Sequence, residues 1–156
     1  MQIYKQNLQK SIEFQVPHIS SYALTIEPKT ALHQWVQSKK IEAPKESEQS
    51  EEFYFMVDFL QNHGFDHYEI SNFGKPDFHS RHNSDYWNYE PYLGIGPSAH
   101  SYDGKDIRSW NVANNQHYLK KILNNELAND KEVLSENEQF NETIMLGLRT
   151  ANGIDL

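Results

Sequence analysis

The sequence predicts an α/β fold, and three patterns close together in the chain support this prediction. His18–Ile26 has the composition of a buried strand, and Phe65–Ile70 has that of a second one. Between them, Glu48–His63 repeats apolar residues with the period of a helix. The two strands are far enough apart for a crossover helix, and strands joined in that way are usually parallel. We therefore expect His18–Ile26 and Phe65–Ile70 to form a parallel pair.

The first helix is expected over residues 2–14, because Ile3, Leu8 and Ile12 recur at roughly helical spacing. No capping residue precedes this helix, so the chain is expected to be a piece of a longer protein. A second, short helix is expected over Thr30–Lys39, with Thr30 as its N-cap.

The strongest helical pattern is that of Glu48–His63. Its apolar residues fall at i, i+3, i+4 and i+7, which is typical of a stripe that faces the core. Gly64 is expected to end this helix as its C′ residue. The stripe consists of Phe53, Met56, Val57 and Leu60.

The second half of the chain is expected to begin with a long irregular loop over Ser71–Pro91, too rich in aromatic residues to be disordered. Tyr92–Gly96 is expected to be a short strand. Ser98–Tyr102 and Ile107–Val112 are expected to be the arms of a hairpin around an Asp-Gly turn. A helix is then expected over Gln116–Leu127.

A final helix is expected to begin at Ser135, because Ser135 and Glu138 have the spacing of a capping box. The chain stops soon after this helix, at a point where another element is expected to begin. The apolar residues of this final helix are Phe140, Ile144, Met145 and Leu148.

Composition excludes several classes of function. A net charge of −8 over 156 residues argues against a nucleic-acid partner and against a polybasic membrane contact. No run of about 20 apolar residues predicts a membrane span, and no signal peptide is recognisable. The absence of cysteine favours a cytoplasmic location and means that this chain cannot supply thiolate ligands to an iron–sulfur cluster.

The most distinctive motif runs from His82 to Trp87. A histidine able to ligate iron precedes Tyr86 and Trp87, whose rings could stack on a porphyrin. Arg81 and Lys75 could pair with its propionates. On composition alone, a histidine packed against its aromatic neighbours is the more frequent explanation. A zinc site that uses His79 and His82 lacks the further ligands that zinc requires.

Two other segments combine glycines or polar groups with predicted strands. Gly94 and Gly96 match G-x-G-x-x-A, but no helix follows to meet a pyrophosphate, so we expect them to allow close approach of a ligand or another strand. His100 either lines a site or belongs to the hairpin. Glu69 and Ser71 are expected on one face of a strand, and Asn72 follows them. These polar groups either orient a cofactor, or Asn72 caps the loop and Glu69 pairs with a lysine.

Four segments in this order resemble one known family: HISSYALTIEP, GFDHYEISNFGKP, RHNSDYWNYEPYLGIGPSAHSY and MLGLRTANGIDL. The chain is similar to the radical SAM proteins related to oxygen-independent coproporphyrinogen III oxidase, and most similar to their heme chaperone branch. The resemblance implies the distal part of an open, partial TIM-like (β/α) barrel over residues 1–113. It also implies a helical segment and the start of a small C-terminal domain over residues 114–156.

The family's cofactors are a [4Fe-4S] cluster, held by a cysteine motif expected upstream of Met1, and S-adenosylmethionine. The resemblance therefore implies that this chain alone is inactive in radical chemistry. It further implies that His82 and its motif bind heme, with His82 as a possible iron ligand, and that a second group faces the cofactor side of the barrel. The implied heme motif is His82, Asn83, Tyr86 and Trp87, and the second group is Glu69, Ser71, Asn72, Gly94, Gly96 and His100.

The function implied is that of a heme chaperone that delivers heme to respiratory enzymes. The alternative is an oxidase that decarboxylates propionates of coproporphyrinogen III. A partial barrel would expose a strand edge and apolar faces, so self-association of the chain is also expected.

Overall fold

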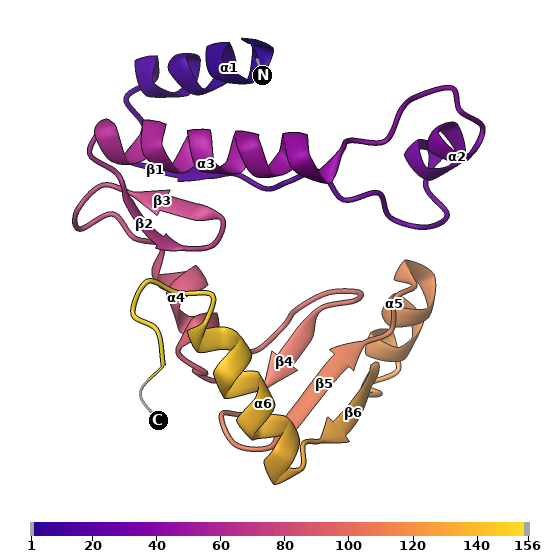
Figure 1. The fold of residues 1–156 in the computed structure, drawn as a ribbon. Coiled ribbons are helices and arrows are strands. Elements are labelled where there is room, and N and C mark those ends of the chain that lie inside the picture. The colour runs from indigo at the N-terminus through magenta and orange to yellow at the C-terminus, as the bar shows by residue number, and fades with distance from the viewer. Residues whose placement is uncertain (1, 155–156) are drawn as a thin grey trace. The chain divides into compact units, whose positions relative to one another are not determined.

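The computed structural model describes residues 2–154, and the chain divides into two compact units. Unit 1 is Met1–Ser80 and unit 2 is Arg81–Leu156. Figure 1 shows the course of the chain through both. The predicted boundary after residue 113 concerns the domains of the family and stays a prediction.

Unit 1 contains three helices and a three-stranded sheet, which confirms the mixed α/β character of this half. The helix predicted over residues 2–14 is present, and so are the two helices that follow it. Its elements are α1 (Gln2–Glu13), β1 (His18–Ser20), α2 (Ala31–Gln37), α3 (Glu46–Asn62), β2 (Asp66–Glu69) and β3 (Asn72–Gly74).

The predicted parallel pair is wrong, because β3 lies between the two strands. β1 and β2 each pair antiparallel with β3, in the order β1-β3-β2. They therefore run in the same direction without being neighbours. The sequence did not indicate β3, since its three residues follow a short turn and are too few to show an alternating pattern. The first strand is also shorter than expected and ends at Ser20.

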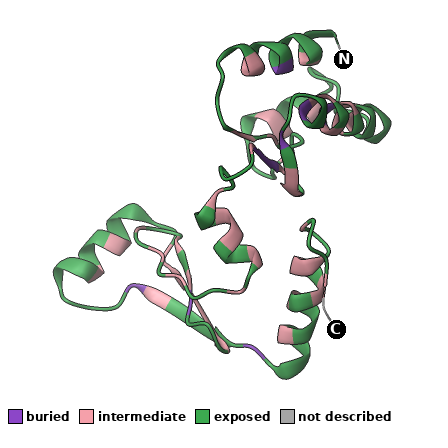
Figure 2. Cartoon of the chain, turned by 90° about the vertical axis from the view of Figure 1, so that its left-hand side faces the viewer, coloured by how far each residue is buried: buried purple, intermediate pink, exposed green. Residues whose placement is uncertain are grey.

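The core of unit 1 forms where α1 and α3 pack on one face of this sheet. Leu60 and Phe73 are completely buried, and Leu8, Met56 and Phe65 complete the cluster. Figure 2 shows how few buried residues there are outside this region of the unit. In α1 the predicted Ile3 is 72% exposed. Tyr4, Leu8 and Ile12 form the packed face instead.

The predicted signals at helix ends in unit 1 are confirmed. The Thr30 side chain accepts a hydrogen bond from the backbone N–H of His33, as an N-cap does. Gly64 follows α3 with φ +76°, a left-handed conformation that glycine adopts without steric cost.

Unit 2 is built on a second antiparallel sheet in the order β4-β5-β6. The predicted hairpin is confirmed: β4 and β5 flank a turn in which Asp103 Oδ1 accepts hydrogen bonds from the N–H groups of Lys105 and Ile107. These donors lower the pKa of Asp103. The elements of unit 2 are α4 (Arg81–Trp87), β4 (His100–Tyr102), β5 (Ile107–Asn111), α5 (Asn115–Leu123), β6 (Asn129–Val133) and α6 (Glu136–Gly147).

Three predictions for unit 2 and the chain before it need correction. The segment Ser71–Pro91 is not an irregular loop, because it contains β3 and α4. Tyr92–Gly96 forms no strand, and only Tyr92 makes a bridge, to Tyr102. The helix α5 ends at Leu123, four residues early, because the chain turns at Asn125, whose φ is +58°.

The strand β6 was not predicted either. Its sequence, Asn-Asp-Lys-Glu-Val, has no apolar alternation, and it is a strand because all five residues pair with β5. The final helix, α6, begins as predicted: the Ser135 and Glu138 side chains accept hydrogen bonds from each other's backbone N–H groups. Among residues 2–154, no helix has the length and apolar character needed to span a membrane.

Candidate functional site

The heme motif implied by the resemblance lies on α4, in unit 2. On this helix His82 and Tyr86 are four residues apart and therefore adjacent on its surface. Their rings meet edge to face, with centroids 4.9 Å apart. Tyr92 packs against Tyr86 in the same manner at 4.7 Å. The structure thus brings His82 beside a pair of tyrosine rings, and both His82 and Tyr86 are exposed.

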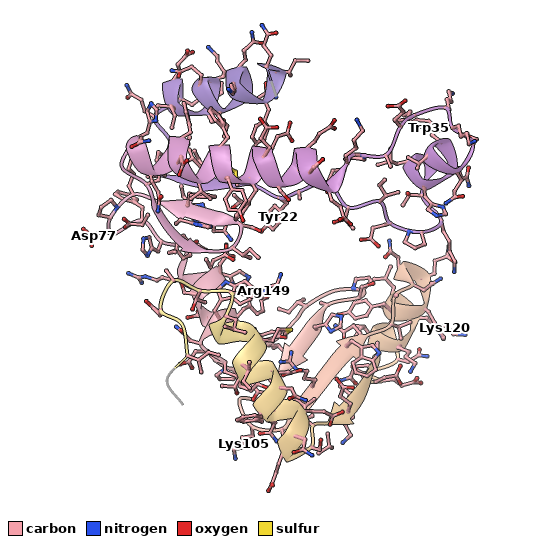
Figure 3. All side chains as sticks on the ribbon, viewed as in Figure 1. Tyr22, Trp35, Asp77, Lys105, Lys120 and Arg149 are labelled. Atoms are coloured by element: carbon pink, nitrogen blue, oxygen red, sulfur yellow. The ribbon has the colours of Figure 1, made fainter. Side chains whose placement is uncertain are left out.

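Trp87 does not join this group of rings. Five residues after His82, it lies on a different side of α4 and is half-buried. The guanidinium of Arg149, which Figure 3 labels, lies over the Trp87 ring at 5.7 Å. Asn83 is half-buried on the same helix. The six-residue motif therefore presents a histidine and a tyrosine together and a tryptophan separately.

The two cations suggested as propionate partners have different surroundings. Arg81 is exposed and directly precedes His82. Lys75 belongs to unit 1, where its ammonium donates to the carbonyl of His63 and lies over the Phe65 ring at 4.3 Å. Of the two cations, Arg81 is therefore the one that lies on the same helix as the motif.

The zinc alternative receives no support from the geometry. His79 Nε2 lies 3.1 Å from Asp66 Oδ2, and its ring stacks on Tyr68 at 4.4 Å. Within the described part of the chain, no three His, Cys, Asp or Glu side chains are grouped to hold a metal ion.

The glycine segment is held against the β4–β5 hairpin. A Cβ on Gly94 would lie 2.0 Å from the backbone oxygen of His100, so the close approach predicted for this segment occurs there. Asn111 Nδ2 donates to the carbonyl oxygens of Gly94 and Gly96, at 3.3 and 2.9 Å. Gly96 has φ +106° and open space around its Cα. The next element after this segment is the strand β4 and not a helix, as the sequence predicts.

His100 is part of that hairpin, and its backbone lies against Gly94. It is exposed and opposite Trp110 on β5, with ring centroids 6.3 Å apart. The cofactor role implied for Gly94, Gly96 and His100 stays a prediction.

Glu69 and Asn72 face each other across the turn between β2 and β3. The prediction that Glu69 and Ser71 share one face of a strand is wrong, because the strand ends at Glu69 and the chain turns through Ser71. Residues opposite each other in a hairpin share a face, so Glu69 and Asn72 do so instead. Ser20 Oγ donates to Asn72 Oδ1 at 2.5 Å.

Glu69 is the most unusual side chain in unit 1. It is only 2% exposed, and its Oε1 meets no hydrogen-bond donor in the described part of the chain. A buried polar atom without a partner costs free energy, because it has lost water and gained nothing in exchange. The position therefore reduces the stability of unit 1.

We expect Glu69→Gln to raise the free energy of unfolding by about 1 kcal/mol, since glutamine keeps the size of the side chain and removes the cost of burying its charge. Urea unfolding followed by circular dichroism measures the change. Glu51→Gln, at an exposed position of α3, is the control and should be nearly neutral. A clear loss of stability in Glu69→Gln would show that the carboxylate is stabilising.

Sequence reasoning missed the surroundings of His18. Its Nε2 lies 2.7 Å from the hydroxyl oxygen of Tyr68, on the same face of the sheet as Glu69. Burial lowers the pKa of His18, Glu69 opposes this, and His79 lowers it further. Histidine in a strand pattern gives no signal of such a contact, because His18 and Tyr68 are 50 residues apart in the sequence.

A second missed group joins β5 to α6 in unit 2. Arg108 Nη2 donates to Glu142 Oε2 at 2.6 Å, and the Tyr89 hydroxyl donates to the same oxygen. Burial and the hydrogen bond to Glu142 raise the pKa of Tyr89. Each of these residues has an ordinary surface pattern in the sequence, so only the fold reveals the group.

The comparisons with known proteins found curated relatives by sequence and a solved structure with a similar fold. No protein-family model matches the chain. It is 36% identical over 154 residues to the heme chaperone HemW of Lactococcus lactis, which covers 99% of this chain and 40% of that protein. It is 40% identical over 140 residues to HemW of a Synechocystis strain, covering 88% of this chain and 34% of that protein.

A solved structure shares the fold. Coproporphyrinogen III oxidase (HemN) from Escherichia coli, a radical SAM enzyme, matches with a TM-score of 0.70 over 94% of this chain and 36% of its own. At 16% identity this likeness concerns the fold alone. The chain spans about 40% of the length of the HemW relative from Lactococcus lactis. By sequence, the chain is similar over most of its length to HemW heme chaperones, and by fold it is similar to HemN.

Proposed function

We propose that this chain is the heme-binding part of a heme chaperone, with α4 as its heme-contacting element. The observation that carries the proposal is the exposed His82 beside the Tyr86 and Tyr92 rings. A histidine nitrogen ligates heme iron, and tyrosine rings offer apolar surface to a porphyrin. The relatives named heme chaperones support the same proposal.

Charge near the motif suits a porphyrin that carries two propionates. Arg81 is exposed beside His82, and the guanidinium of Arg149 lies over Trp87 in the same unit. Arginine pairs with carboxylates through two parallel hydrogen bonds. Arg81 therefore belongs to the proposed heme surface, despite a net charge of −8 for the chain, whereas Arg149 lies with Trp87 on another side of α4.

Radical chemistry requires groups that this chain does not provide. The family's [4Fe-4S] cluster is held by cysteine thiolates, and the chain has no cysteine. The residues present therefore do not fit the cluster, and we assign no radical step and no S-adenosylmethionine contact to them. Four further properties are also proposals, and they rest on the resemblance to the family. They are the partial barrel, the transfer of heme to respiratory enzymes, a cytoplasmic location and self-association.

The oxidase is the second candidate, and its support is the fold shared with HemN. Fold alone does not determine function. The relatives matched at 36% and 40% identity carry the chaperone name, which favours the chaperone.

Titration with hemin tests the proposal through the Soret band. We expect saturable, one-to-one binding by the chain and about tenfold or greater loss of affinity in His82→Ala, because the iron loses its protein ligand. His117→Ala, which removes another exposed histidine of unit 2, is the matched control and should bind as the parent does. Equal affinity in His82→Ala, or equal loss in both variants, would contradict the assignment.

A further inference from the structure

The chain turns sharply after α4, at Tyr89, and this turn brings Tyr92 back onto the helix. Tyr89 has φ +61°, a left-handed conformation that costs free energy in a residue other than glycine. Beyond the turn, the Tyr92 ring packs against Tyr86 of α4, with centroids 4.7 Å apart. The proposed heme surface therefore depends on the shape of this turn.

The side chain of Tyr89 is held by three groups. Its hydroxyl donates to Glu142 Oε2 of α6, and its ring meets the buried Tyr102 ring edge to face, with centroids 4.8 Å apart. The guanidinium of Arg108 lies 5.8 Å from the centre of the Tyr89 ring. A strained backbone conformation persists where the surrounding contacts fix it, and such residues are frequent at functional sites. These contacts therefore offset the strain at Tyr89.

Arg108 of β5 connects Glu142 with the far side of the turn. Its Nη2 donates to Glu142 Oε2 at 2.6 Å, and its Nη1 donates to the Tyr92 hydroxyl oxygen at 3.4 Å. A planar guanidinium presents both donors in a fixed geometry, which the ammonium of lysine does not. The Arg108 and Glu142 side chains are each 25% exposed, so solvent screens this ion pair less than a pair at the surface.

The helix α4 needs such support from neighbouring elements. None of its residues, Arg81–Trp87, is buried, so packing in the core does not fix its place. The contacts of Tyr89, Arg108 and Glu142 fix the chain directly after it instead. These three residues lie outside the His82 motif, on the turn, on β5 and on α6.

We propose that Tyr89, Arg108 and Glu142 form a clamp that positions Tyr92 against Tyr86 and thereby raises the affinity for heme without touching it. The three are positioning residues, because they act through the Tyr92 ring. This inference rests on the proposed heme function and adds to it the residues that hold the heme-contacting surface together.

Hemin titration of two Glu142 variants tests the clamp. Glu142→Ala removes the acceptor of both hydrogen bonds, so we expect hemin affinity to fall about fivefold. Glu142→Gln keeps an amide oxygen that can accept them, so it should retain most of the affinity. Glu132→Gln is the matched control, because Glu132 is exposed and faces Arg108 from β6 in the sheet register. This control should bind hemin as the parent does.

A double-mutant cycle distinguishes positioning from a general loss of stability. Tyr92→Ala removes the ring that the clamp holds. If the clamp acts through this ring, adding Glu142→Ala to Tyr92→Ala should have little further effect on hemin affinity. Circular dichroism checks that each variant folds.

Amide hydrogen exchange of the chain without hemin gives an independent readout. In Glu142→Ala, exchange over residues 81–92 should become faster, because the turn and α4 lose their support. Exchange in α3 of unit 1 is the internal reference and should not change.

The proposal is overturned if Glu142→Ala binds hemin as tightly as the parent, if Glu142→Gln loses as much affinity as Glu142→Ala, or if the effects of Glu142→Ala and Tyr92→Ala add fully. If the parent chain shows no saturable hemin binding, the proposed heme function fails, and hydrogen exchange then decides on the clamp. Faster exchange over residues 81–92 in Glu142→Ala supports it, and unchanged exchange overturns it.

Discussion

Phe73→Ala should lower the free energy of unfolding of unit 1 by about 3–5 kcal/mol. Phe73 is completely buried at the centre of the β1-β3-β2 sheet, where it pairs with Ile19 on one side and His67 on the other. Its ring stacks on His67 with centroids 4.4 Å apart. Truncation removes this contact and leaves a cavity that the strands on both sides cannot close without losing their register.

A loss of that size is a large part of the stability of a typical domain, about 5–15 kcal/mol. Urea unfolding followed by circular dichroism measures it, and amide hydrogen exchange shows whether the change is confined to unit 1. Phe78→Ala is the control, because Phe78 belongs to the same unit and is 56% exposed. Similar losses in the two variants would mean that the packing around Phe73 contributes little.

Gly94→Ala should destabilise unit 2 by about 3 kcal/mol or more, because no side chain fits at this position. The added Cβ would lie 2.0 Å from the oxygen and 2.8 Å from the nitrogen of His100, both backbone atoms that cannot rotate away. Separating the two segments would break the backbone hydrogen bonds between Tyr92 and Tyr102, of 2.9 and 3.0 Å.

The same change should weaken heme binding, because Tyr92 packs on Tyr86 of the proposed site. Thermal unfolding and the Soret titration measure the two effects. Gly96→Ala is the matched control: it has open space around it but φ +106°, so it should cost only the conformational strain of about 1–2 kcal/mol. If Gly96→Ala is the more damaging variant, steric exclusion at Gly94 is not the reason for its glycine.

Some features of the chain were determined by short stretches of sequence. The α3 stripe, the caps at Thr30 and Ser135, the turn at Gly64 and the β4–β5 hairpin depend on residues within a few positions of one another. Their geometry follows from local sterics and from nearby hydrogen bonds. The ordered segments around His82 were likewise enough to predict the similarity to heme chaperones that the sequence comparison shows.

Other features were decided only by contacts between distant residues. The strand β3 lies between β1 and β2, and β6 is a strand only because β5 pairs with it, although its own residues are polar. Pairing of backbone groups can overrule such weak local preferences.

The same division applies to the candidate sites. The spacing of His82 and Tyr86 placed them together once α4 formed, but the addition of Tyr92 and the separation of Trp87 required the fold. Burial of Glu69 without a partner for its Oε1 depends on the turn into β3 and on what packs over it. Sequence therefore determined which residues carry the chemistry, and tertiary structure decided which of them meet, because burial and contact arise from segments far apart in the chain.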